Sequence, residues 1–125
     1  MQLKDRVAIV TGAGQGIGAS VARAYAREGA KVAVVDMNGV AAEEVAAAIV
    51  GAGGTALGIA CDVADRGQVA AMAALVNATW GRIDILVNNA AYQKHQASIE
   101  DITDEQFDET FRTNIFGYFY MARAA

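Results

Sequence analysis

Short apolar runs alternate along the chain with longer segments in which apolar positions recur every three or four residues. The short runs are rich in β-branched residues and end at glycines or acids, a pattern typical of buried parallel strands. They cover residues 7–10, 31–36, 56–62 and 83–88. Four strands are therefore expected.

The longer segments predict the helices that connect these strands. They cover residues 17–25, 40–50 and 65–80, and one helix from residue 103 to the end of the chain. Asp65 with Gln68, and Thr103 with Gln106, are spaced as N-terminal capping pairs. Strands that alternate with helices of about a dozen residues predict a parallel sheet covered by helices on both faces and joined by right-handed crossovers.

Composition and charge narrow the class of protein. Hydrophobic residues make up 54% of the 125 residues and charged residues 19%, which indicates a globular fold rather than a disordered or membrane protein. The net charge is -4 and the basic residues are scattered, so nucleic acid is not an expected partner. The first apolar run is too short for a signal or membrane-spanning segment, which favours a cytoplasmic setting.

No linker, low-complexity tract or proline divides the chain, so residues 1–125 are expected to form one domain. Cys61, the only cysteine, lies among apolar neighbours and is expected to be a buried, unreactive thiol. The last residues are helix-forming and lack a stop signal, so we expect the chain to end inside a helix, truncated at its carboxyl end. The broad apolar surface of that helix is expected to be buried on several sides. It consists of Ile115, Phe116, Phe119, Tyr120 and Met121.

A glycine cluster follows the first strand where the next helix begins. It reads Thr11-Gly12-Ala13-Gly14-Gln15-Gly16-Ile17-Gly18. Glycines at such a turn let a diphosphate approach the backbone amides at the helix start. Two registers fit: Gly12, Gly16 and Gly18, which we prefer because it begins at the strand end, or Gly14, Gly16 and Ala19. A turn without a ligand is the alternative for a glycine cluster alone.

Asp36 makes the nucleotide interpretation stronger. It ends the second strand at about the distance along the chain where an acid binds the adenosine ribose. A carboxylate there repels the 2′-phosphate of NADP, and neither Ala13 nor Met37 supplies a compensating cation. We therefore expect NAD as the cofactor.

These motifs together resemble the short-chain dehydrogenase/reductase family, and the resemblance extends over the whole chain. Thr11-Gly12-x-x-x-Gly16-x-Gly18 is similar to the family's cofactor motif, Asp62-Val63 to its adenine contact and Asn88-Asn89-Ala90-Ala91 to its motif at the end of the fourth strand. Asn114 resembles the helix asparagine of the catalytic tetrad. We predict a three-layer, doubly wound Rossmann fold with strand order 3-2-1-4. The predicted cofactor-binding residues are Gly12, Gly16, Ile17, Gly18, Asp36, Asp62, Val63, Asn89 and Ala90, with Asn114 as the catalytic residue.

The resemblance implies an oxidoreductase that interconverts a secondary alcohol and a ketone, with a homodimer or homotetramer partly built by the terminal helix. The family's catalytic Tyr-x-x-x-Lys pair is absent, because the residues four positions after the tyrosines are Gly29, Gln96, Ala122 and Ala124. The catalytic serine is absent too, so this chain alone is expected to be inactive. A non-catalytic dinucleotide-binding module and an NADP-dependent ketoacyl-type reductase remain alternatives.

Residues 92–96 follow the fourth strand, where ligands of doubly wound sheets bind. From that position their side chains could approach the nicotinamide or the substrate, but a polar surface loop is the favoured interpretation. His95 is the only histidine and no acid cluster accompanies it. No metal site is predicted.

Overall fold

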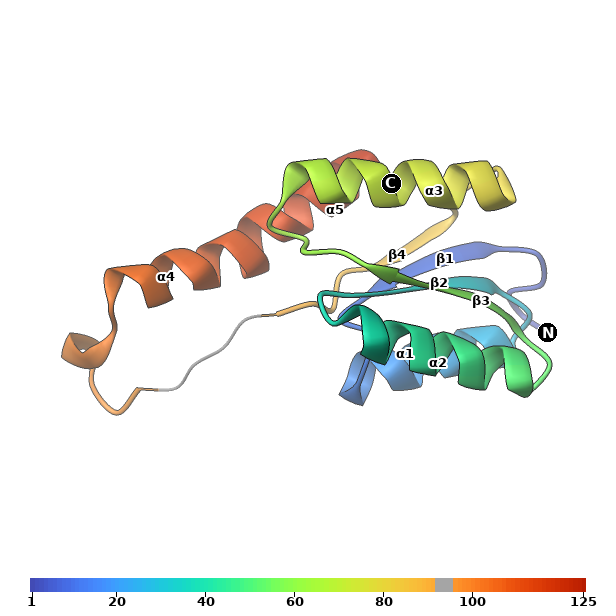
Figure 1. The fold of residues 1–125 in the computed structure, drawn as a ribbon, viewed down its shortest axis with the longest axis horizontal. Coiled ribbons are helices and arrows are strands. Elements are labelled where there is room, and N and C mark those ends of the chain that lie inside the picture. The colour runs from blue at the N-terminus through green and yellow to red at the C-terminus, as the bar shows by residue number, and fades with distance from the viewer. Residues whose placement is uncertain (92–95) are drawn as a thin grey trace.

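The computed structural model describes residues 1–91 and 96–125. The chain alternates strands and helices up to β4 and is helical after it (Figure 1). The elements are β1 (Val7–Thr11), α1 (Gly16–Arg27), β2 (Lys31–Asp36), α2 (Gly39–Gly51), β3 (Thr55–Ala60), α3 (Arg66–Trp80), β4 (Ile85–Val87), η1 (Ile99–Asp101), α4 (Asp104–Phe111), η2 (Arg112–Gly117) and α5 (Tyr118–Ala124).

All four strands form one parallel sheet in the order β3-β2-β1-β4. This order confirms the predicted 3-2-1-4 arrangement. Val10 pairs with Val34 of β2 and with Val87 of β4, so the carboxyl ends of β1, β2 and β4 meet at one edge of the sheet. The loops that follow these strands therefore lie next to one another.

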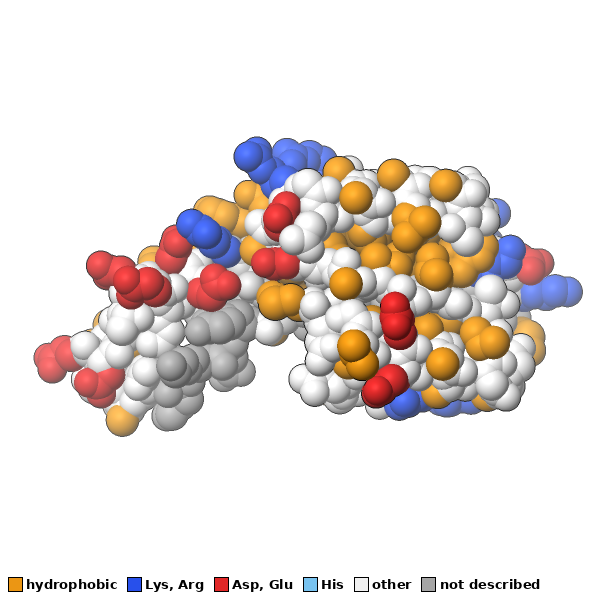
Figure 2. All heavy atoms as spheres, in the orientation of Figure 1, with side chains coloured by type: hydrophobic (Ala, Val, Ile, Leu, Met, Phe, Trp, Pro, Cys, Tyr) orange, Lys and Arg blue, Asp and Glu red, His pale blue; other side chains and the backbone are white. Residues whose placement is uncertain are grey.

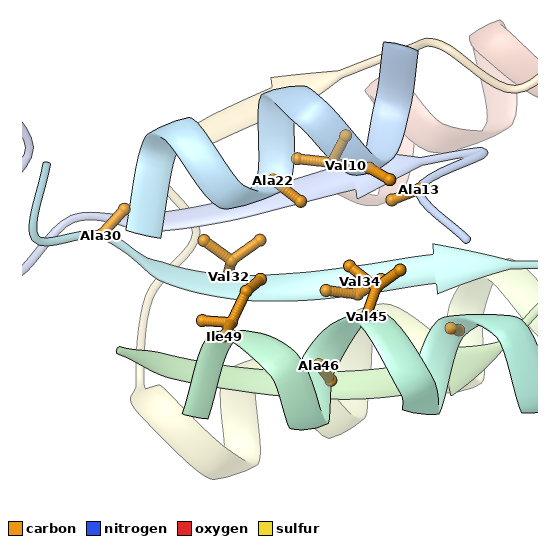
Figure 3. Packing of buried hydrophobic residues seen from close by; sticks show 11 residues of the cluster. Val10, Ala13, Ala22, Ala30, Val32, Val34, Val45, Ala46 and Ile49 are labelled. Atoms are coloured by element: carbon orange, nitrogen blue, oxygen red, sulfur yellow. The ribbon is translucent and has the colours of Figure 1, made fainter. Parts of the chain in front are cut away.

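Alternate residues of the central strands supply two separate cores. Val10, Val32 and Val34 face α1 and α2 (Figure 3). Ile9 and Val35 face the opposite side, where α3 and α5 cover the sheet. Because β1 and β2 are buried on both faces, their sequences are continuous apolar runs rather than alternating ones.

Side-chain caps fix the starts of three helices. Asn38, Asp65 and Thr103 accept hydrogen bonds from backbone N–H groups in the first turns of α2, α3 and α4. The predicted caps at Asp65 and Thr103 are thus confirmed. The Gln68 side chain differs from a reciprocal capping box: its Nε2 donates to the Asp65 carboxylate at 3.2 Å, while its Oε1 accepts from the Asp62 N–H at 2.9 Å.

Two strands are shorter than predicted. β3 ends at Ala60 rather than at residue 62, because the chain turns there: the Asp65 N–H donates to the Asp62 carbonyl at 3.0 Å. β4 covers only Ile85–Val87 rather than residues 83–88. Before it, the Asp84 carboxylate accepts from the Val7 N–H at 2.9 Å, so a side chain takes the place of a ladder hydrogen bond.

The terminal helical segment departs from the prediction in two ways. The single helix expected from residue 103 onward is interrupted by six residues of π-helix, Arg112–Gly117. Within the single chain, most of the apolar surface expected to be buried on several sides is exposed. Met121 is fully buried against α3, but Ile115, Phe116 and Phe119 are each about half exposed. The reason is geometric, because α4 extends away from the sheet (Figure 1) and no described element covers this face.

Candidate nucleotide-binding site

A cavity of about 370 Å³ opens at the carboxyl ends of the strands. Its lining comes from the loops after β1, β2, β3 and β4 and from the π-helical turn. The lining residues are Gly12, Gln15, Ile17, Asp36, Met37, Cys61, Val63, Asn89, Ala90, Ala91 and Thr113. Segments distant in sequence thus meet at the edge of the sheet where ligands of doubly wound folds bind.

The glycine turn packs too closely against its neighbours for side chains. Gly12 has φ +62°, and a Cβ there would lie 2.9 Å from the Ala90 Cα. A Cβ on Gly18 would collide with the Gly12 carbonyl oxygen and would lie 2.6 Å from the Asn89 Nδ2. Gly16 has φ +58° but open space around it. Two glycines are therefore required by close approach, and Gly16 by its left-handed backbone.

The buried Thr11 hydroxyl joins this turn to the end of β4. It donates to the Val87 carbonyl at 3.2 Å and accepts from the N–H groups of Asn89 and Ala90, both at 3.0 Å. The Asn89 side chain adds a hydrogen bond from Nδ2 to the Gly12 carbonyl at 3.3 Å. These four bonds hold two walls of the cavity at a fixed separation.

The start of α1 differs from the starts of α2, α3 and α4. Among residues 1–91 and 96–125, no side chain forms a hydrogen bond that caps α1, whose N-cap residue is Gln15. The first N–H groups of a helix have no partner inside it and carry a partial positive charge. This helix start borders the cavity through Gln15 and Ile17. It therefore offers backbone donors to an anion.

Asp36 is held in place at the end of β2 by two backbone groups. Its Oδ2 accepts from the Gly14 N–H and its Oδ1 from the Asn38 N–H, both at 2.9 Å. A Cβ on Gly14 would lie 2.9 Å from the carboxylate carbon, so glycine is needed for this approach. Each oxygen keeps a further lone pair for a ligand hydroxyl. No lysine or arginine is among the described residues that line the cavity.

Cys61 and Val63 form the wall beyond β3. The thiol is 2% exposed, as predicted, and its burial, together with Asp62 and Asp65, raises its pKa to about 11. At neutral pH it is a protonated, apolar wall element rather than a nucleophile. The Asp62 carboxylate instead accepts from the Ala64 N–H at 2.9 Å and does not line the cavity.

Comparison with known proteins decides the family. The family model described as "short chain dehydrogenase" matches residues 6–125. The chain belongs to the short-chain dehydrogenase family.

Two curated bacterial relatives are similar to this short-chain dehydrogenase over nearly its whole length. The D-threitol dehydrogenase of Mycolicibacterium smegmatis is 46% identical over 98% of the chain and 47% of its own length. The sorbitol dehydrogenase of Cereibacter sphaeroides is 44% identical over 99% of the chain and 47% of its own length. The chain thus spans about half the length of these relatives.

Solved structures agree with the fold. A short chain dehydrogenase from Mycobacterium avium superposes on the whole chain with a TM-score of 0.95 and 37% identity, over 46% of its own length. A 3-ketoacyl-(acyl-carrier-protein) reductase from Brucella melitensis, complexed with NADH, superposes on 97% of the chain with a TM-score of 0.91 and 37% identity, over 48% of its own length. The α/β Rossmann architecture of this short-chain dehydrogenase is thereby established.

The structure brings together most, but not all, of the residues predicted to bind a cofactor. The predicted residues that line the cavity are Gly12, Ile17, Asp36, Val63, Asn89 and Ala90. Those that do not line it are Gly16, Gly18 and Asp62, and neither does Asn114, which was predicted as the catalytic residue. Gly16 and Gly18 shape the turn behind it, while Ala13 is fully buried and makes no wall.

Five lining residues were not predicted as site residues: Gln15, Met37, Cys61, Ala91 and Thr113. Gln15 and Ala91 lie inside motifs that were singled out, so their position next to the predicted glycine and asparagine was the available signal. Thr113 precedes Asn114 in the π-helical turn, and no periodicity marked it. Residues 92–95 lie outside the described residues, so the predicted polar loop is described only at Gln96, whose Nε2 donates to Gln106 Oε1 at 3.2 Å.

Asn114 lies in the π-helical turn, which approaches β4 and the β3–α3 loop. The Asn88 Nδ2 donates to the Tyr118 carbonyl at 3.4 Å, and a Cβ on Gly117 would lie 2.7 Å from the Val63 Cγ2. These contacts hold the π-helical segment and the start of α5 against β4 and the β3–α3 loop.

Neither a metal-binding cluster nor a membrane-spanning helix is found in the described part of the chain. No group of three or more His, Cys, Asp or Glu residues there is placed to hold a metal ion. No helix there has the length and apolar character needed to cross a membrane.

Proposed function

We propose that the chain is the NAD-binding part of an oxidoreductase that interconverts a secondary alcohol and a ketone. One observation carries the proposal: a carboxylate oriented by two backbone amides shares a cavity with an uncapped helix start. The backbone N–H donors of the helix start match the diphosphate of a dinucleotide. The carboxylate, which accepts hydrogen bonds from hydroxyls, matches its adenosine ribose.

The cavity fits such a dinucleotide at both ends. Backbone N–H groups of Gly16, Ile17 and Gly18, at the start of α1, would bind the diphosphate. Asp36 would accept hydrogen bonds from the ribose hydroxyls, and Val63 would contact the base. Asp62, Asn89 and Ala90 complete the proposed cofactor-binding set. When bound, the nicotinamide would accept or donate a hydride.

NAD rather than NADP is the proposed cofactor. A 2′-phosphate beside Asp36 would place two negative charges about 4 Å apart, at a cost of a few kcal/mol at intermediate dielectric. The described lining offers no cation that would offset this repulsion. We expect NAD to bind at least about tenfold more tightly than NADP.

The test is calorimetric titration of the purified chain with both cofactors. Asp36→Asn removes the charge and should narrow the difference between them. Asp65→Asn is the matched control, because it removes a carboxylate that caps α3 outside the cavity and asparagine caps equally well. Equal or tighter binding of NADP by the unchanged chain would contradict the proposal.

The proposed reaction needs residues that this sequence does not contain. Asn114 is the proposed catalytic-class residue, where it would position a proton relay, but no tyrosine is followed four residues later by a lysine. Without that acid/base pair the substrate hydroxyl cannot lose its proton as the hydride leaves. We expect the 125-residue chain to bind NAD and not to oxidise D-threitol or sorbitol, the substrates named for its relatives. Reproducible NADH formation by the purified chain would refute this expectation.

The missing pair also favours a second candidate, a dinucleotide-binding module without catalysis. It makes the same binding prediction and differs in the sequence that follows residue 125 in the gene, where a serine and a Tyr-x-x-x-Lys motif would favour the enzyme. A ketoacyl-type reductase that prefers NADP is the less favoured alternative because of Asp36. All three share the proposed nucleotide site.

We further propose that the protein is a homodimer or homotetramer built in part by its terminal helices. The support is an apolar stripe on α4, η2 and α5 whose members lie at helical spacing and are 43–59% exposed. It consists of Phe107, Phe111, Ile115, Phe116 and Phe119. Carboxylates gather beside it on η1 and α4, at the left of Figure 2. Exposed apolar surface with a charged rim is typical of a protein interface.

A further inference from the structure

Thr113 is a buried threonine whose hydroxyl has no hydrogen-bond partner among the described residues. The residue is 6% exposed and borders the nucleotide cavity. Two other helical threonines, Thr79 and Thr110, each donate to the carbonyl four residues earlier, at 2.8 and 2.9 Å. Within the described part of the chain, the Thr113 hydroxyl makes no such bond and no other one.

The Thr113 hydroxyl is nevertheless not sealed inside the protein. Asn88 Oδ1 is the one side-chain polar atom of the described residues that is both fully enclosed and without a partner. Thr113 Oγ1, which also lacks a partner among the described residues, therefore reaches accessible space, and the space that Thr113 borders is the cavity. Buried hydroxyls nearly always find a partner, so an unpaired one that faces a cavity indicates a partner supplied by a ligand.

The π-helical turn places Thr113 on the β3 side of that cavity. Gly117, one turn later on the same face, is pressed against Val63, and a Cβ there would lie 3.2 Å from the Val63 carbonyl. Val63 and Asp36 follow the neighbouring strands β3 and β2. In the proposed binding mode Asp36 takes the ribose of the adenosine, so the adjoining wall of Val63 and Thr113 faces the adenosine half.

We propose that the Thr113 hydroxyl is a further nucleotide contact, a hydrogen-bond partner of the adenosine half of the cofactor. The proposal rests on the proposed NAD-binding function and deepens it. It also gives the π-helical turn a role at the site, because the turn carries Thr113 into the cavity wall while Asn114 follows it. The contact would add affinity at the end of the cofactor distant from the reacting ring.

Thr113→Val tests the proposal, because valine keeps the shape of threonine and removes the hydroxyl. Dissociation constants are measured by calorimetry for NAD and for ADP-ribose, which has the adenosine half but no nicotinamide. We expect Thr113→Val to bind both ligands about three- to tenfold more weakly, as the loss of one neutral hydrogen bond predicts. Thr113→Ser, which keeps a hydroxyl, should stay within about twofold of the unchanged chain.

The matched control is Thr110→Val, since Thr110 lies in the same helical segment with its hydroxyl bonded to the Gln106 carbonyl. It should bind both ligands as the unchanged chain does. Thermal unfolding of each variant establishes that it is folded, and Thr113→Ala replaces the valine variant if that one is not. Unchanged affinity of the folded Thr113 variant for both ligands overturns the inference, as does a loss confined to NAD.

The two proposals fail in distinguishable ways. If the unchanged chain binds neither NAD nor ADP-ribose, the proposed function falls and this inference falls with it. If the unchanged chain binds both and the loss of the Thr113 hydroxyl has no effect, only the Thr113 contact is wrong.

Discussion

The end of β1 and the terminal helices differ in how far their side chains are buried and find partners within the chain. Around Thr11, one buried hydroxyl makes three hydrogen bonds that tie β1 to β4, and the surrounding strand residues are fully buried. Along α4, η2 and α5, the backbone is helical but the apolar stripe from Phe107 to Phe119 is about half exposed. Figure 1 shows the same contrast, with β1 inside the sheet and α4 extending from it.

The contrast indicates which part of the molecule depends for its stability on contacts within the chain. Substitutions at the strand ends should affect folding first, because every partner of these groups lies within the chain. Substitutions on the terminal stripe should affect association first, because those side chains are about half exposed and bury little surface within the chain. The predictions below test this difference in the order of the stability effect expected.

The largest loss is expected for Thr11→Val. Valine matches threonine in shape but leaves the Ala90 N–H without its acceptor, while the Asn89 N–H keeps only its hydrogen bond to the Val87 carbonyl at 3.1 Å. We expect the free energy of unfolding to fall by about 2–4 kcal/mol, since the unpaired Ala90 N–H costs about 1–3 kcal/mol and the other lost hydrogen bonds about 1 kcal/mol. Urea unfolding measures it.

Thr11→Ser is the control for the loss of the methyl group. It keeps the hydroxyl and should cost only about 1 kcal/mol. Equal losses in the two variants would mean that the hydroxyl network contributes little, and that the contrast between the two regions rests on packing alone.

The next largest loss is expected for Gly18→Ala. The added Cβ would collide with the Gly12 carbonyl oxygen, and backbone cannot move aside as a flexible side chain can. Overpacking should lower the free energy of unfolding by about 1–3 kcal/mol even though alanine favours helix. NAD affinity should fall too, because the glycine turn would shift.

Gly51→Ala supplies the matched control for the change from glycine to alanine. Gly51 ends α2, and nothing lies within 4 Å of a Cβ built there. This variant should be neutral or more stable by up to about 1 kcal/mol. A similar destabilisation in both variants would show that helix propensity, rather than close packing at the turn, explains the loss.

The same contrast explains how much could be predicted from the sequence. β1 and β2 were recognisable because burial on both faces produces continuous apolar runs, and the turn after β1 because its glycines follow a strand end. Asp36 was recognisable because its spacing from those glycines reflects one strand–helix–strand unit. These features depend on local sequence, so a pattern of residues was sufficient.

Features that depend on contacts between distant segments were not recognisable. Thr113 lines the cavity because Gly117 packs against Val63, about fifty residues earlier, and no periodicity records that contact. The apolar residues of the terminal segment were identified correctly, but their spacing could not say what covers them. Asp62 was predicted as a cofactor-binding residue from its motif, and the motif did not indicate the local hydrogen bond that its carboxylate accepts from the Ala64 N–H.

A smaller effect is expected at Cys61 and depends on pH. Burial raises the pKa of the folded thiol from 9.0 to about 11. Below pH 9 the thiol is protonated in both the folded and the unfolded chain, so the stability that the buried thiol contributes is fully present. As the pH rises through 9 the unfolded chain ionises first, and this contribution is lost progressively up to about pH 11.

The pH effect should amount to about 1 kcal/mol at pH 10. It is measured as the difference in unfolding free energy between the unchanged chain and Cys61→Ala at pH 7.5 and at pH 10. Cys61→Ala is less stable at pH 7.5 because it leaves a small cavity, and the gap should narrow at pH 10. A gap that stays constant would mean that the thiol titrates alike in the two states.

The smallest effect on stability is expected on the terminal stripe. Phe107 and Phe111 have ring centroids 4.7 Å apart and are 59% and 43% exposed. Replacing both with glutamine, a good helix former, should change the free energy of unfolding by no more than about 1 kcal/mol. Val40→Gln is the control, because Val40 is 67% exposed on α2, away from the stripe.

Substitutions on the stripe should affect the association of the protein more than its stability. If the stripe is an interface between copies of the protein, the double variant should dissociate at concentrations at least about tenfold higher than those at which the unchanged protein does, since two apolar anchors are lost. Sedimentation velocity over a range of concentrations measures this, and Val40→Gln should match the unchanged protein. Unaltered association in the double variant would remove the stripe from the interface. A large loss of stability would instead show that the terminal helices depend on these rings for folding, as the strand ends depend on Thr11.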